Sequence, residues 1–199
     1  MVGRRRRALA VFQRMRDLRG DDLYAAASEA QLLAQLGQQA EATLAQQQLV
    51  DRHPGHAAGW FNLGYLLQQA GRDAEAQAAF RAAIDLQPGL DRAWYGLGLS
   101  LMRLGRLAGA DGAAAAFERN TAMQPFSPLG WQQLARVYAQ LGREADAARI
   151  VHRLHAFEPR VAAQLQRELG QGGAAVAGPA AGAPAAGGQT ASSGVAAWN

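Results

Sequence analysis

The feature that most constrains the fold of this sequence is an apolar phrase that occurs twice, 34 residues apart. Residues 60–72 read WFNLGYLLQQAGR, and residues 94–106 read WYGLGLSLMRLGR. Weaker copies in the same register begin at Ala26 and at Trp131. Self-similarity at a period of roughly 20–50 residues is typical of repeat architectures, in which one unit cannot bury its own apolar face. The sequence therefore predicts a stack of similar units that share a core.

Each copy has the pattern of two amphipathic helices joined by a turn. In the best copy, the apolar residues of the first half share one helix face: Trp60, Leu63, Gly64 and Leu67. Those of the second half form a small–large–small stripe: Ala76, Phe80 and Ala83. Gly71 is placed to end the first helix, and Pro88 cannot continue the second. We expect a glycine at position 64 because two helices approach closely there.

These residues resemble the tetratricopeptide repeat family, whose motif is W-x2-L-G-x2-Y, then A-x3-F, then P. Residues 60–88 carry nearly all of it, with Leu67 in place of the tyrosine. The copy that begins at Trp131 keeps the tyrosine as Tyr138 and has Ala135 where glycine is expected. The match spans roughly residues 23–161. The resemblance implies an all-α fold, a right-handed α-solenoid of helix-turn-helix repeats.

The period divides the chain into four segments. Residues 1–22 are expected to form an arginine-rich half repeat or capping helix, because Ala8, Phe12 and Met15 lie one period before Ala42, Gln46 and Leu49. Four tetratricopeptide repeats are expected in 23–159, and a polar capping helix in 160–170. The uncharged Ala/Gly/Pro-rich stretch 171–199 is expected to be a disordered tail. The half repeat is either a natural cap or the result of an internal start.

The third repeat is expected to be three residues longer than the others, since 37 residues separate Trp94 from Trp131. Alignment places the excess at 109–111, within GRLAGADGAAAAF. One interpretation is a lengthened turn between the two helices, with Asp111 as a possible N-cap. The other is a distorted first turn of the second helix. The glycines on both sides of Asp111 favour the turn.

Composition and spacing exclude several kinds of chemistry. The chain has no cysteine, so disulfides, thiolate catalysis and cysteine-ligated zinc are excluded. The histidine pairs, His53 with His56 and His152 with His155, lack an evident third metal ligand. No serine, paired carboxylates or glycine-rich loop forms a catalytic pattern. We therefore expect no enzymatic activity, no metal and no cofactor.

The N-terminal stretch does not have the features of a membrane or secretion signal. No apolar run reaches the roughly 18–20 residues of a membrane helix, so no transmembrane segment is expected. The apolar stretch ALAVF that follows the first arginines is too short for a signal peptide. These patterns predict a cytoplasmic protein of undefined oligomeric state.

The resemblance implies that the first helices of successive repeats line a concave surface that holds a peptide. The candidate groove residues are Phe61, Asn62, Tyr65, Gln68, Arg92, Tyr95, Leu99, Met102, Arg103, Gln132 and Arg136. Exposed aromatic and apolar residues among arginines would favour a partner with apolar and acidic residues. The alternative is that the aromatic residues only thicken the packing between helices. Of the positions at which some family members clamp a C-terminal carboxylate, only Asn62 and Arg92 fit, so that clamp is not expected.

The predicted function is a non-catalytic adaptor or assembly factor for protein–protein interaction. The alternative is a nucleic-acid- or anionic-membrane-associated assembly protein that uses the arginine-rich N-terminal helix. That helix contains Arg4 to Arg7 with Arg14, Arg16 and Arg19, and all 20 basic residues of the chain are arginine. No aromatic stacking platform accompanies the cluster, so an arginine-rich solvated cap is the simpler explanation and nucleic acid is a less favoured partner.

Overall fold

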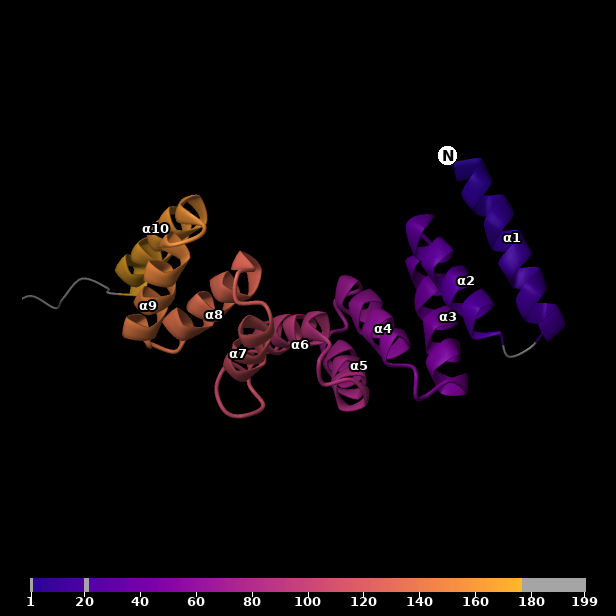
Figure 1. The fold of residues 1–199 in the computed structure, drawn as a ribbon, viewed down its shortest axis with the longest axis horizontal. Coiled ribbons are helices and arrows are strands. Elements are labelled where there is room, and N and C mark those ends of the chain that lie inside the picture. The colour runs from indigo at the N-terminus through magenta and orange to yellow at the C-terminus, as the bar shows by residue number, and fades with distance from the viewer. Residues whose placement is uncertain (1, 20–21, 177–199) are drawn as a thin grey trace, which may run out of the picture.

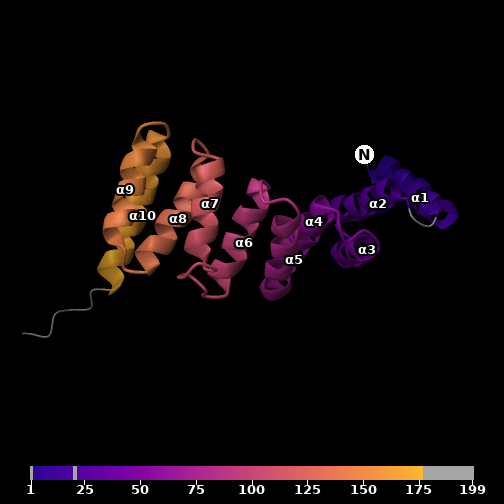
Figure 2. The ribbon, with the colours of Figure 1, turned by 60° about the horizontal axis from the view of Figure 1, so that its bottom comes forward.

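The computed structural model describes residues 2–19 and 22–176, which contain ten helices and no strand. The helices are α1 Val2–Arg19, α2 Leu23–Gln35, α3 Gln39–Arg52, α4 Ala57–Gln69, α5 Asp73–Leu86, α6 Asp91–Arg103, α7 Ala113–Met123, α8 Pro128–Gln140, α9 Glu144–His155 and α10 Pro159–Val176. Each helix packs against the next along the chain. The result is an elongated stack that runs from α1 at one end to α10 at the other (Figures 1 and 2). The expected all-α repeat solenoid is confirmed.

The tryptophan and the proline of the repeat motif are joined by a hydrogen bond. The indole Nε1 of Trp60 donates to the carbonyl oxygen of Pro54 at 2.8 Å. Trp94 donates to Pro88 at 2.9 Å in the same way. The pair Trp131 and Pro125 repeats the bond at 3.0 Å. Each bond ties the start of one repeat to the end of the preceding one.

Glycines end the first helices because the chain must adopt a left-handed backbone there. Gly71 has φ +72° and Gly142 has φ +70°. The backbone N–H of Arg72 returns to the carbonyl oxygen of Leu67 at 2.9 Å, which satisfies an otherwise unpaired group of α4. A residue with a side chain would be strained at these positions.

Phe80 is the centre of the core between the second and third repeats. Its side chain is 1% exposed, and it lies against Gly64 of α4 and Gly96 of α6. A Cβ atom added at Gly64 would lie 2.8 Å from the ring, and one added at Gly96 would lie 2.5 Å from Cζ. Phe117 has the same relation to Gly98 in the third repeat. These close approaches explain why glycine occupies the motif position 64.

The extra residues of the third repeat lie in the turn between α6 and α7. Residues 104–112 are not α-helical, and α7 begins only at Ala113. The N-cap is Gly112, which has no side-chain capping bond, so the suggested capping role of Asp111 is wrong. Asp111 instead forms an ion pair with Arg81 of α5, 3.4 Å away. The lengthened turn therefore reaches back onto the preceding repeat.

The two ends of the solenoid are single helices. α1 covers the stretch 4–19 and packs against α2, and α10 packs against α8 and α9. The prediction of a disordered tail from 171 is wrong for 171–176, which continue α10. No proline occurs in 171–176, and proline is the residue that would break the helix outright. Residues 177–199 lie outside the described part of the chain.

Candidate functional site

The candidate groove is formed by the first helices of three repeats, since α6 contacts both α4 and α8. The predicted residues that are exposed are Asn62, Tyr65, Arg92 and Arg103. Those that are half-buried are Phe61, Tyr95, Leu99, Met102, Gln132 and Arg136. The remaining one, Gln68, is buried.

The most accessible aromatic and cationic groups lie where α4 meets α6. Tyr65 is 51% exposed and lies one helical turn beyond Phe61 on the same face of α4. The guanidinium of Arg92, from α6, lies 5.0 Å from the centre of the Phe61 ring. Arg92 has no ion pair with any residue that the structure describes. Its charge is therefore accessible for a ligand, held above an aromatic face.

Several half-buried groove residues also contribute to the core. The Tyr95 ring lies edge-on to Phe117 with 5.8 Å between centroids, and Phe61 lies 6.0 Å from Phe80. Leu99 and Met102 pack on the same core. These side chains therefore thicken the packing between helices, as the alternative interpretation expects. Each also leaves one edge exposed at the surface of the candidate groove.

The placement of Gln68 in the groove is wrong. Its side chain is 7% exposed, and its amide Nε2 donates to the Gly96 carbonyl at 3.1 Å and to Ser100 Oγ at 2.8 Å. It therefore joins α4 to α6 from within the core. Arg103 lies beside it and donates to the Gln68 carbonyl oxygen at 3.3 Å. Gly96 has no side chain to keep the Gln68 amide away from its backbone carbonyl, so this glycine is the sequence signal for the contact.

The arginine at the far end of the groove has an acidic partner. Arg136 Nη2 lies 2.8 Å from Glu168 Oε2 of α10. The pKa of Glu168 is lowered, first by the hydrogen bond from Arg136 and then by the one from Gln164. The carboxylate of a ligand would have to compete with Glu168 at this arginine. Arg103 likewise lies 3.3 Å from Asp73 Oδ1, so Arg92 is the groove arginine without an acidic partner among the described residues.

Comparison with known proteins agrees with this geometry. The tetratricopeptide repeat profile matches residues 57–90, which hold α4 and α5. Residues 57–90 therefore form a tetratricopeptide repeat. The crystal structure of MamA superposes with a TM-score of 0.72 at 18% identity and covers 79% of this chain and 85% of MamA. A MamA fragment from Desulfovibrio magneticus RS-1 gives 0.71 at 18%, covering 78% and 86%.

A further similar structure is that of YrrB, described as a TPR protein with an unusual peptide-binding site. Its TM-score is 0.73 at 18% identity, with coverage of 83% of this chain and 85% of YrrB. No curated protein matches the chain in sequence. At these identities the likeness establishes the tetratricopeptide fold.

Among the described residues, the histidine pairs and the carboxylate-clamp positions form no further site. His152 and His155 are exposed on α9, and no group of three metal-binding side chains occurs within residues 2–19 and 22–176. Among the same residues, no helix combines the length and the apolar character needed to cross a bilayer. At the family's carboxylate-clamp positions, Asn62 and Arg92 are exposed, whereas Gly96 is buried against Phe80 and offers no side chain.

Proposed function

We propose that this tetratricopeptide-repeat protein is a non-catalytic adaptor or assembly factor that holds a segment of a partner protein on α4, α6 and α8. The observation that carries the proposal is the surface of Phe61, Tyr65 and Arg92, called here the groove patch. An aromatic ring that is half exposed beside a cation without an acidic partner is typical of interaction surfaces. Tetratricopeptide-repeat proteins are generally scaffolds, and the peptide-binding site described for YrrB supports the same role.

The chemistry of the groove patch favours a segment with apolar and acidic residues. Phe61 and Tyr65 offer aromatic surface, and Arg92 offers a guanidinium that pairs well with a carboxylate. Asn62 is also exposed on α4, and its side-chain amide can form hydrogen bonds with the backbone of an extended peptide. The partner is therefore proposed to be a protein segment with an acidic residue near an apolar one.

Substituting Tyr65→Ala together with Tyr95→Ala is expected to abolish capture of the partner. Buried aromatic anchors contribute about 2 kcal/mol or more each at interfaces, which corresponds to roughly a 30-fold loss per residue. The measurement is affinity capture from native cell lysate with immobilised protein, followed by mass spectrometry. Helical content by circular dichroism should be unchanged. Tyr65→Ala alone, which removes no ring that packs against the core, should give a smaller loss of capture.

The matched control for the groove patch is Tyr24→Ala. Tyr24 is 69% exposed on α2, outside the groove patch, so Tyr24→Ala removes the same side chain from a different surface. Capture should persist with this variant. If the double variant and Tyr24→Ala retained the same partners, the groove patch would not be the binding surface.

The second candidate function uses the exposed arginines of α1 on a polyanion or an anionic membrane. The observation in its favour is that Arg4, Arg5, Arg6 and Arg7 are all exposed. Arg16, in contrast, is engaged with Glu29 of α2. The outward positive charge of α1 is therefore concentrated in its first two turns.

Neutralising Arg4 to Arg7 with glutamine is expected to reduce the salt dependence of binding to duplex DNA, if this second function holds. Four lost phosphate contacts correspond to a decrease of about 3–4 in the slope of log K against log salt. The control removes the same charge from exposed arginines elsewhere: Arg106, Arg119, Arg160 and Arg167. Equal slopes for the two quadruple variants would contradict a role for α1.

A further inference from the structure

A hollow opens between the second helices α7 and α9, across α8, and is called here the α7–α9 hollow. Its volume is about 680 Å³, within the roughly 300–1,000 Å³ typical of ligand sites. Its apolar wall includes Trp131, Leu134 and Ile150. Trp131 and Leu134 lie on a different face of α8 from Gln132 and Arg136, because these pairs are out of phase at helical spacing. The hollow is therefore separate from the groove.

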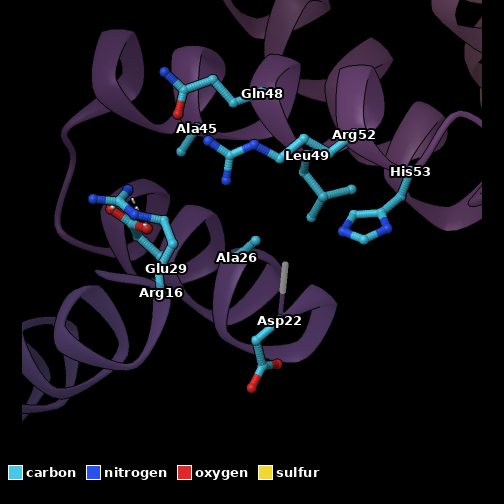
Figure 3. A pocket seen from close by; sticks show the side chains of 9 residues that line it. All are labelled: Arg16, Asp22, Ala26, Glu29, Ala45, Gln48, Leu49, Arg52 and His53. Atoms are coloured by element: carbon cyan, nitrogen blue, oxygen red, sulfur yellow. Dashed lines mark hydrogen bonds and ion pairs between the residues drawn. The ribbon is translucent and has the colours of Figure 1, made fainter. Parts of the chain in front are cut away.

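The equivalent hollow of the first repeat lies between α1, α2 and α3, and an ion pair forms part of its lining. Ala26 and Glu29 stand at the repeat positions that hold Trp131 and Leu134 in the fourth repeat. Arg16 of α1 lies 2.7 Å from Glu29, and the two side chains lie together on one side of the hollow, opposite Ala45 and Arg52 (Figure 3). The remaining volume is only about 10 Å³. This hollow has no room for a ligand.

The equivalent hollow of the third repeat lies between α5, α6 and α7, and the lengthened turn occupies part of it. Asp111 and Gly112 of that turn line the hollow beside Trp94 and Leu97. The Asp111 carboxylate lies 3.4 Å from Arg81 of α5. The volume left is about 210 Å³. In both of these hollows, an arginine of the preceding second helix, Arg16 of α1 or Arg81 of α5, is thus paired with a carboxylate that the chain itself supplies.

The two carboxylates of the α7–α9 hollow are engaged by other groups. Asp146 pairs with Arg143 at 2.6 Å and also with Arg149. Glu118 accepts a hydrogen bond from the Tyr138 hydroxyl at 2.6 Å. Burial, followed by this bond to Glu118, raises the pKa of Tyr138 to about 12, so the hydroxyl remains a donor at neutral pH. Neither carboxylate neutralises the last arginine of the hollow.

That last arginine is Arg153 of α9. Its guanidinium lies 4.5 Å from the centre of the Trp131 ring. Within residues 2–19 and 22–176 it forms no ion pair or hydrogen bond. Stacking on an indole orients a guanidinium and leaves its N–H groups available in the ring plane. With three arginines and two acidic residues, the lining has an excess positive charge.

We infer that the α7–α9 hollow is a second binding site, and that it takes a partner segment with an acidic side chain next to an apolar one. The apolar side chain packs against Trp131, Leu134 and Ile150. The carboxylate pairs with Arg153, which rests on Trp131 and has no acidic partner among the described residues. The site faces away from the groove, so the protein can join two segments at once. It does not depend on the function proposed for the groove patch.

The test is a nuclear magnetic resonance titration of the ¹⁵N-labelled full chain with the blocked peptide Ac-ALEA-NH₂. The expected result is saturable shifts at the Trp131 indole and the Arg153 amide. The peptide Ac-ALQA-NH₂, which lacks the charge, is expected to bind at least tenfold more weakly. Arg153→Gln should reduce the affinity for Ac-ALEA-NH₂ to the level of the uncharged peptide.

The matched control is Arg119→Gln, because Arg119 is exposed on α7 at the position of Arg153 one repeat earlier, and this variant should bind like the unmodified chain. Tyr65→Ala should also leave the shifts at Trp131 in place, which separates this site from the groove patch. Equal affinity for the two peptides would overturn the inference. So would an unchanged affinity in Arg153→Gln, or shifts confined to α4 and α6.

Discussion

Replacing Phe80 with alanine is expected to lower the free energy of unfolding by about 3–5 kcal/mol. The ring is 1% exposed and lies between Gly64 of α4 and Gly96 of α6. Neither glycine has a side chain that could move into the space, so the cavity would persist. Because the same ring contacts helices of two repeats, its loss should weaken the coupling between them as well as the repeat itself.

Urea unfolding followed by far-ultraviolet circular dichroism measures the effect of Phe80→Ala. The matched control is Phe126→Ala, which removes a ring that is 77% exposed and has its main aromatic contact with Phe157. The control should cost less than about 1 kcal/mol. A broader transition, with one half of the chain unfolding before the other, is expected for Phe80→Ala alone. Equal losses in the two variants would contradict the central place of Phe80.

Replacing Arg16 with alanine is expected to lower the free energy of unfolding by about 3 kcal/mol. The Glu29 side chain is 5% exposed, and Arg16 supplies its ion pair at 2.7 Å. Without Arg16, the weaker contact from Gln13 Nε2 at 3.4 Å is the remaining bond to that carboxylate from α1. A buried carboxylate that loses its cation is strongly destabilising, so α1 should detach from α2.

Hydrogen exchange of the α1 and α2 amides, together with urea unfolding, measures the loss in Arg16→Ala. Arg14→Ala is the matched control, because Arg14 is exposed on the same helix and its removal should change stability by less than about 0.5 kcal/mol. The double variant Arg16→Ile with Glu29→Leu should recover the stability. These substitutions introduce the residues that stand at the equivalent positions in the hollow of the third repeat, which are Ile84 and Leu97. Failure of this rescue would show that the ion pair is not the cause.

Much of the fold could be predicted from the sequence because the repeat signal is local. Trp94 and Pro88 are six residues apart and bonded to each other, and each glycine turn needs only its neighbours. The lengthened turn was also visible as a three-residue excess between Trp94 and Trp131. The ion pair of Asp111 could not be predicted, since its partner Arg81 is 30 residues away and belongs to another helix.

The candidate groove could be predicted only at the level of helix faces. Tyr65 and Gln68 are three residues apart on α4 and look equally available, yet one is 51% exposed and the other 7%. The difference arises because the Gln68 amide reaches the Gly96 carbonyl, which depends on how closely α6 approaches α4. Arg136 and Arg92 differ in the same way, because only Arg136 has Glu168 within reach.

The sequence by itself determined the repeat period, the helix pairs and the glycine and proline positions, since these follow from backbone conformation and the spacing of apolar residues along one helix. Only the packed structure decided which charges pair between different helices. Arg16 and Glu29 meet across two helices, whereas Arg153 rests on Trp131 without a carboxylate. The physical reason is that long charged side chains find their partners across the packed repeats, at distances that no local pattern encodes.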